Sequence, residues 1–191
     1  MTSIATAAPT RRIFLGGATL SAAAIYLLDG NGKAAAMAPG AAGNDVAILN
    51  VALGLEHEAI GAYQIGAESH LLSAPVLQVA VLFQGHHKGH RDALIGAIQQ
   101  LGGTPVAAKT TAQYAEALHA NTLHSEADVL GFAKGLELGA INAYLGVIPS
   151  FDNKDFGKVC GRLAADETMH WTVLTQVLKQ SLPSAPLTFG A

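Results

Sequence analysis

Cysteine is almost absent from this sequence, and its scarcity limits the chemistry that the chain can carry. The single Cys160 excludes an intramolecular disulfide and any zinc or iron–sulfur site built from several thiolates. We expect its side chain to be a small apolar group in the core. Charged residues make up only 13% of the chain, and the net charge of −3 brings no excess of Lys and Arg. We therefore expect no nucleic-acid partner.

Aromatic residues are also few, and strand-like sequence is missing. Aromatic side chains make up 6% of the chain although half of all residues are hydrophobic, so small side chains carry much of the apolar content. Ala and Leu favour helices. No segment shows the period-two alternation of β-branched residues that indicates a strand. The sequence predicts an all-α protein.

The first 40 residues differ in composition from the rest of the chain. Arg11 and Arg12 precede an apolar run, residues 13–28, and small residues follow Lys33. This is the order of regions in an export signal, and residues 10–15 resemble the twin-arginine export motif. The apolar run has 16 residues, fewer than the roughly 20 of a membrane-spanning helix, which favours cleavage over an uncleaved anchor. We predict an export signal and N-terminal tail over residues 1–40, no stable membrane span after cleavage, and a periplasmic or other bacterial envelope location.

Four later segments place apolar residues at helical spacing. They cover residues 45–69, 74–101, 126–147 and 153–180. The residues expected to cap their N-termini are Asn44, Ser73, Ser125 and Asp152.

The connections between these segments predict how the helices are arranged. Tight turns join the first helix to the second and the third to the fourth, whereas residues 102–124 join the middle two. We expect a short helix near residues 114–119 inside this long connection. The pattern predicts a four-helix bundle over residues 44–182 with one long crossover between helices two and three, followed by a C-terminal tail, residues 183–191.

The two halves of the bundle carry the same spaced motif. Each half has a Glu seven residues before a Tyr, and a pair of side chains three residues apart follows about thirty positions after the Glu. The first half contains Glu56, Tyr63, His87 and His90. The second half contains Glu137, Tyr144, Glu167 and His170.

This repeat predicts a metal site inside the bundle. Residues three apart in a helix share one face, so each pair points the same way. The candidate metal ligands are Glu56, His87, His90, Glu137, Glu167 and His170. Carboxylate and imidazole ligands suit one or two ions of iron or manganese, and they also accept zinc. We expect the hydroxyls of Tyr63 and Tyr144 to hydrogen bond ligand carboxylates.

Residues 55–63, 86–94 and 166–170 together resemble the ferritin-like di-metal carboxylate proteins, which include bacterioferritins and rubrerythrins, and the exported desiccation-related type. The resemblance covers about residues 45–181 and implies a ferritin-like bundle. It also implies that Glu56 and His90 bind one metal, that Glu137 and His170 bind the other, and that Glu167 bridges them. Asp166 would orient a ligand histidine, His90.

His87 departs from this pattern, because the resemblance implies a second bridging Glu there. Only three carboxylates then face two divalent ions, and a neutral imidazole has one available lone pair. Three alternatives follow: an altered di-metal site, a single metal, or a bundle that has lost its metal. His86 and Glu58 are the nearest replacements for the missing carboxylate, but helical direction predicts that both point elsewhere.

The resemblance leads to two functional hypotheses. The first is an exported metalloprotein, an oxidoreductase of the di-metal carboxylate type whose reduced iron or manganese reacts with oxygen or peroxide. The second is a non-catalytic envelope protein that serves in stress protection or partner binding. An iron-storage cage is disfavoured because no fifth helix is predicted, and a homodimer is one assembly that the sequence leaves open.

Several remaining residues are assigned structural positions. Met169 and Trp171 are expected in the core. The residues expected at the surface or in loops are His57, His70, His119, His124, Arg91 and Asp92.

Overall fold

The structure, a computed structural model, describes residues 41–186 and is built from four long helices. These are α2 (Ala41–Glu68), α3 (Ala74–Gln100), α5 (Glu126–Val147) and α6 (Lys154–Val177). No strand occurs between residues 41 and 186, so the predicted all-α fold is confirmed. The predicted export signal and residues 187–191 lie outside the described part of the chain.

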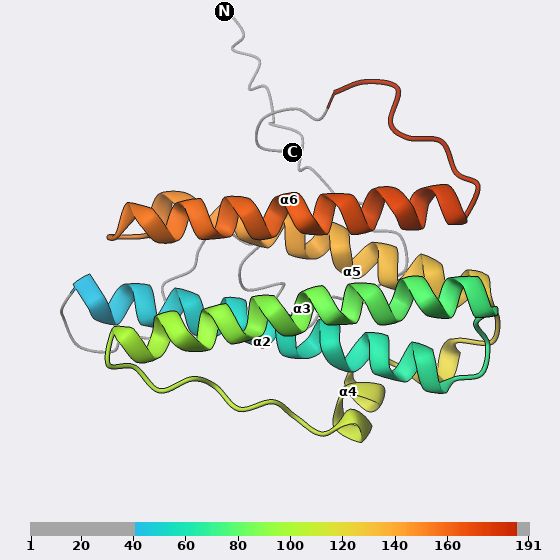
Figure 1. Ribbon diagram of the computed structural model, residues 1–191, viewed down its shortest axis with the longest axis horizontal. Coiled ribbons are helices and arrows are strands. Elements are labelled where there is room, and N and C mark those ends of the chain that lie inside the picture. The colour runs from blue at the N-terminus through green and yellow to red at the C-terminus, as the bar shows by residue number, and fades with distance from the viewer. Residues whose placement is uncertain (1–40, 187–191) are drawn as a thin grey trace, which may run out of the picture.

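The helices form two pairs that pack together as a bundle (Figure 1). α2 packs mainly against α3, and α5 packs mainly against α6. The connection between the pairs runs along the bundle and contains the short helix α4 (Thr111–Ala117) and the 3-10 turn η1 (Ala120–Thr122). A second 3-10 turn, η2 (Ile148–Ser150), lies between α5 and α6. The predicted long crossover is therefore present, and its helix begins three residues earlier than expected.

Local capping determines where two of the helices begin. The Ser125 side chain accepts a hydrogen bond from the Asp128 backbone nitrogen at 3.1 Å, which satisfies an N–H group that the first turn of α5 leaves unpaired. Asn153 caps α6 in the same way, accepting from the Asp155 nitrogen at 3.0 Å. The prediction of Asp152 as this cap is wrong by one residue.

The beginning of α2 makes long-range contacts, and its bounds differ from the prediction. α2 begins at Ala41, so Asn44 is not its N-cap. The Asn44 amide donates instead to the Ser150 carbonyl oxygen at 2.9 Å. Asp45 accepts hydrogen bonds from the backbone nitrogens of Asp152 and Asn153 at 2.8 and 2.9 Å. These bonds attach the beginning of α2 to the turn that precedes α6.

The core consists of two apolar clusters with a polar layer between them. One cluster includes Leu49, Leu53, Leu94, Ile98 and Cys160, and the predicted burial of Cys160 is confirmed. The other includes Val76, Phe83, Leu130 and Leu174. The ionisable residues of the predicted metal site lie in the layer that separates the clusters.

Two predicted positions on α6 differ from the structure. Met169 is 54% exposed, so its assignment to the core is wrong. It directly precedes the buried His170, and one helical step rotates a side chain by about 100° to another face. Trp171 is half-buried and forms part of neither buried cluster.

The crossover covers part of α2. A Cβ atom at Gly61 would lie 2.6 Å from the Tyr114 ring, so glycine allows α4 to approach α2 closely. His57 is buried, and its Nε2 lies 3.1 Å from the Val106 carbonyl oxygen in the crossover. Its predicted surface position is therefore wrong. Among the helices that the structure describes, none combines the length and apolar content needed to cross a bilayer.

Candidate metal centre

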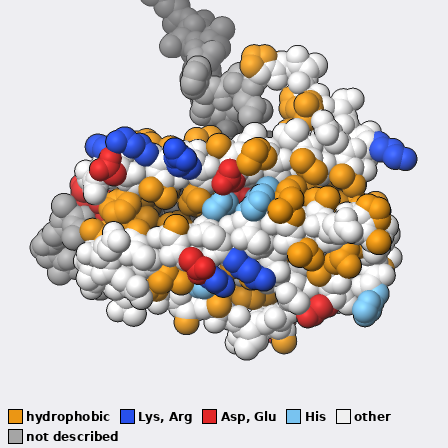
Figure 2. Space-filling model, viewed as in Figure 1, with side chains coloured by type: hydrophobic (Ala, Val, Ile, Leu, Met, Phe, Trp, Pro, Cys, Tyr) orange, Lys and Arg blue, Asp and Glu red, His pale blue; other side chains and the backbone are white. Residues whose placement is uncertain are grey.

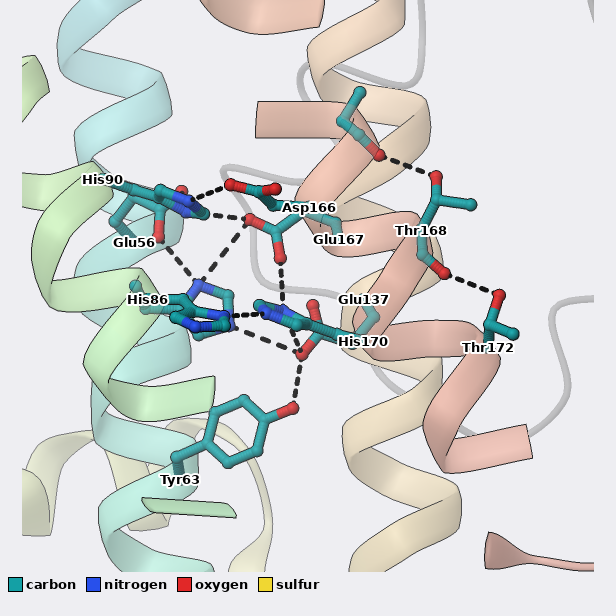
Figure 3. Close-up of polar contacts among 12 residues, drawn as sticks. Glu56, Tyr63, His86, His90, Glu137, Asp166, Glu167, Thr168, His170 and Thr172 are labelled. Carbon is teal, nitrogen blue, oxygen red and sulfur yellow. Dashed lines mark hydrogen bonds and ion pairs between the residues drawn. The ribbon is translucent and has the colours of Figure 1, made fainter. Parts of the chain in front are cut away.

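The six predicted ligand residues meet in one buried cluster at the middle of the bundle. Each long helix contributes, since one Glu comes from α2, one from α5, and one pair from each of α3 and α6 (Figure 3). His90 is 8% exposed and the others are 2% exposed or less. Burying so many ionisable groups is costly unless they compensate one another or bind a cation.

The cluster contains two overlapping groups of metal-ligand atoms. One group is Glu56, His87, His90 and Glu167, and the other is His87, Glu137, Glu167 and His170. Within each group, one ligand atom from every residue lies within 4.8 Å of the others. Glu167 and His87 belong to both groups. Nitrogen and oxygen ligands in this combination suit iron, manganese or zinc.

Glu167 lies between the two groups and presents one oxygen to each. Its Oε1 lies 3.3 Å from His90 Nδ1, and its Oε2 lies 2.9 Å from His170 Nδ1. Within residues 41–186 these four buried side-chain atoms have ion-pair contacts but no hydrogen bond of good geometry. Native proteins rarely leave such atoms unsatisfied. A cation on each side of Glu167 would satisfy them, so the residues present fit a metal centre.

The outer nitrogens of the two histidines are held by residues of the neighbouring helix. His90 Nε2 lies 3.0 Å from Asp166 Oδ2, as the resemblance implied. His170 Nε2 lies 2.9 Å from His86 Nδ1. Both contacts direct a ring Nδ1 toward Glu167, as groups behind a metal ligand commonly do.

His86 was predicted to point away from the centre, and this is only partly right. It does not replace the missing carboxylate, but it contacts the outer side of His170. The repeat contains the signal for this position, because His86 precedes His87 as Asp166 precedes Glu167. If the repeat is extended by one residue at the start of each pair, His86 and Asp166 occupy equivalent positions, and equivalent roles could have been predicted for them.

The two tyrosines hold carboxylates across the bundle. Tyr63 on α2 donates a hydrogen bond to Glu137 on α5, and Tyr144 on α5 donates one to Glu56 on α2. Spacing predicted a carboxylate partner but not that each Tyr contacts the Glu of the opposite half. Burial, and then the adjacent carboxylate, raise the pKa of both hydroxyls well above the usual value for tyrosine. Both therefore remain neutral donors at physiological pH.

His87 spans the centre between the same two carboxylates. Its Nδ1 lies 2.8 Å from Glu56 Oε2, and its Nε2 lies 3.4 Å from Glu137 Oε1. Burial alone would lower the pKa of His87, but the hydrogen bonds to Glu137 and Glu56 outweigh burial and raise its pKa well above the usual value. A protonated ring at this position supplies positive charge between two buried carboxylates.

Protons compensate the other buried charges in the same way. Burial lowers the pKa of His90, but the Glu167 and Glu56 carboxylates raise it further, to about 10. The pKa of His170 is also raised, since Glu137 and Glu167 outweigh its burial. Burial raises the pKa of Glu137, but hydrogen bonds from His170 and His87 lower it below the usual value. Protonated His87 and His90 thus compensate part of the buried negative charge in metal-free protein.

Comparison with known proteins identifies the family of the chain. Residues 44–180 match the family described as the ferritin-like domain. The fold is similar to the crystal structure of a conserved hypothetical protein from Mycobacterium tuberculosis, with a TM-score of 0.62 and 23% identity over 74% of this chain and 100% of that chain. No curated protein matches. Because the family match covers most of the sequence, the chain belongs to the ferritin-like domain family.

Proposed function

We propose that this protein is an exported metalloprotein whose bundle holds iron or manganese, and that the reduced metal reacts with oxygen or peroxide. The supporting observation is the set of buried atoms without hydrogen-bond partners on His90, Glu167 and His170. His90 Nδ1 lies 3.5 Å from Glu56 Oε1, and His170 Nδ1 lies 3.4 Å from Glu137 Oε1, so carboxylates of α2 and α5 lie beside the same atoms. A bound cation would give these atoms a partner that offsets the cost of their burial.

Each residue has a definite part in this proposal. Glu56 and His90 would hold one metal, Glu137 and His170 would hold the other, and Glu167 would contribute to both. Iron or manganese bound there supplies one-electron redox chemistry. Tyr63 and Tyr144 fix the orientation of the two terminal carboxylates, and the apolar clusters on either side keep bulk water away.

A second candidate, a non-catalytic bundle for stress protection or partner binding, is favoured by one observation. His87 already contacts both Glu56 and Glu137, and a protonated ring does part of the work of a cation. In that case the double variant Glu137→Ala with His170→Ala would lose no metal-dependent stability. If metal is bound, the same variant loses the stabilisation that metal gives the unaltered protein.

Metal analysis of protein purified from its native host decides between these functions. We expect between about one and two equivalents of iron or manganese per chain, held by the ligand set described above. The double variant, purified in parallel, should retain at most about half of that amount because it keeps only the Glu56 and His90 half. Fewer than about 0.2 equivalents in the unaltered protein would contradict the metalloprotein proposal.

Metal binding should release protons and strengthen as the pH rises. The pKa of His87 is raised well above its usual value and that of His90 to about 10, so these two rings carry protons in metal-free protein at neutral pH. A metal must displace such protons, so each displaced proton makes the affinity fall about tenfold per unit of decreasing pH. For His90 this dependence should extend up to its pKa of about 10. Calorimetric titration with Mn²⁺ in buffers of different ionisation enthalpy measures the release, and an enthalpy independent of the buffer would contradict it.

Export is tested separately from metal binding. We expect the exported protein to begin between Met37 and Asn44, because the region of small residues precedes the first helix. N-terminal sequencing of protein recovered from the envelope fraction measures this directly. An intact Met1 in that fraction would show that the segment is not removed, whereas the metal analysis would remain valid.

A further inference from the structure

An apolar cavity extends from the metal centre toward the crossover. Its volume is about 60 Å³, and α2, α5 and the crossover form most of its wall. Residues that line it include Leu55, Ala62, Leu118, Leu123, Ala133 and Leu136. Leu123 and Ala133 are half-buried, so this wall approaches the molecular surface.

The inner end of the cavity is formed by residues of the centre itself. His87 and Glu137 both contribute to its lining, and each belongs to a group of candidate ligand atoms. Tyr63 lines the cavity beside them and donates its hydrogen bond to Glu137. A molecule in the cavity would therefore contact the centre on the side where His87 replaces a carboxylate.

The polar groups of this lining are already engaged. Tyr63 pairs with Glu137, His87 contacts Glu56, and Glu58 also has an interaction partner. The buried side-chain atoms without hydrogen-bond partners in the described bundle belong to His90, Glu167 and His170, none of which lines the cavity. These polar side chains already have partners, so the cavity presents a mainly apolar surface to an occupant.

The size of the cavity favours an occupant larger than one water. A cavity needs roughly 10–15 Å³ by this measure to hold a water molecule, and the water needs two or more polar partners. At about 60 Å³ the space is several times larger than one water needs, and most of its lining residues are apolar. An engineered apolar cavity of about 150 Å³ stays dry and binds benzene or xenon, so the smaller cavity here favours a ligand no larger than these.

The polar route to the centre lies on a different side of the bundle. Figure 2 shows histidine side chains at the middle of the face formed by α3 and α6. His86 is partly exposed, and the Asp166 side chain is 41% exposed; these two residues contact the outer nitrogens of His170 and His90. Polar groups thus connect the centre to the surface on the face of α3 and α6, whereas the cavity wall of α2 and α5 is mostly aliphatic.

From these observations we infer that the cavity is a binding site for a small, uncharged hydrocarbon-like molecule, which it holds against His87 and Glu137. The inference depends on the shape and lining of the cavity and not on the presence of metal. If the inference failed, the metalloprotein proposal would remain intact. If metal-free protein bound a hydrocarbon, that result would support the cavity inference without supporting the metalloprotein proposal.

Benzene is the probe for the first test, and a cavity-filling variant is the comparison. Calorimetric titration of metal-free protein should detect benzene binding, and saturating benzene should raise the melting temperature because it binds only the folded state. Ala133→Leu adds three carbons to the cavity wall and should weaken benzene binding at least tenfold. Ala127→Leu, at an exposed position of the same helix, is the matched control and should bind benzene as the unaltered protein does.

Two results would overturn the inference from this test. One is the absence of benzene binding to the unaltered protein. The other is equal affinity in the Ala133→Leu and Ala127→Leu variants, which would place the benzene elsewhere. Far-UV circular dichroism establishes that each variant retains its helices before the titrations are compared.

Crystals of the unaltered protein pressurised with xenon give a second test that needs no substitution. We expect a xenon peak within the cavity, in contact with aliphatic side chains such as Leu136 and beside His87. Xenon bound only outside the cavity, or no xenon at all, would overturn the inference. The same experiment on the Ala133→Leu variant should show the peak reduced, but the result with the unaltered protein is sufficient.

Discussion

Replacing Glu167 with glutamine should remove metal from both halves of the centre while leaving the metal-free bundle folded. Glu167 is the carboxylate that presents one oxygen to His90 and the other to His170. An amide keeps the shape of the side chain but loses the negative charge, and its nitrogen cannot serve as a ligand while it donates hydrogens. Each metal would therefore lose a charged ligand in a buried position.

The fold should survive this substitution because other carboxylates remain near both histidines. His90 Nδ1 lies 3.5 Å from Glu56 Oε1, and His170 Nδ1 lies 3.4 Å from Glu137 Oε1. Neither imidazole would be left without a nearby negative charge. The amide also avoids the cost of burying a carboxylate, a cost seen in the raised pKa of Glu167, which burial dominates.

The measurement is the increase in melting temperature that saturating Mn²⁺ or Fe²⁺ produces. Metal at about 100 times its dissociation constant stabilises a folded protein by about 2.7 kcal/mol, which corresponds to roughly 5–10 °C for a chain of this length. Glu167→Gln should weaken binding at least about 100-fold and so lose nearly all of this increase. The control is Glu116→Gln, which removes the same charge at an exposed position on α4. This variant should retain the full increase in melting temperature with metal. An undiminished increase in the Glu167 variant would mean that metal binds elsewhere.

The elements that could be predicted from the sequence are those determined by local interactions. The bounds of α5 were predicted correctly, since Ser125 and Asp128 lie within one helical turn and their contact is visible as a sequence pattern. The start of α2 was not predicted correctly. Asn44, expected as its cap, instead donates a hydrogen bond to Ser150, which lies 106 positions away. No local pattern carries information about a partner at that separation.

The same distinction explains the candidate site. Helical spacing is sufficient to place His87 with His90 and Glu167 with His170, because residues three apart share a face. It cannot show which helix lies opposite that face, so the exchange of tyrosine partners between the halves was missed. The burial of His57 was missed for a related reason, because only the folded crossover brings Val106 over it.

Replacing His87 with glutamate should change the metal-free and metal-bound proteins in opposite directions. The resemblance to di-metal carboxylate proteins implies a Glu at this position, and the structure places His87 between Glu56 and Glu137. Glutamate would supply a fourth carboxylate, which balances two divalent ions, so we expect two metals per chain and at least about tenfold tighter binding.

Without metal, the same substitution should be strongly destabilising. The protonated ring of His87 contacts two carboxylates that are 1% and 2% exposed. Removing it and adding another buried carboxylate leaves negative charge uncompensated, which costs about 3–5 kcal/mol. Urea unfolding in the presence of a chelator measures this loss, and circular dichroism with metal present shows whether the bundle forms.

The control is His87→Gln, which removes the ring without adding charge. It should lose stability in the metal-free protein, since the imidazolium is gone, but it should not bind metal more tightly than the unaltered protein. Tighter binding by the glutamate variant alone would therefore assign the effect to the fourth carboxylate. If both variants bound metal equally, the space left by the imidazole, and not the charge, would limit the second ion. If neither bound more metal, the contacts of His87 with Glu56 and Glu137 would not be what limits metal binding in this bundle.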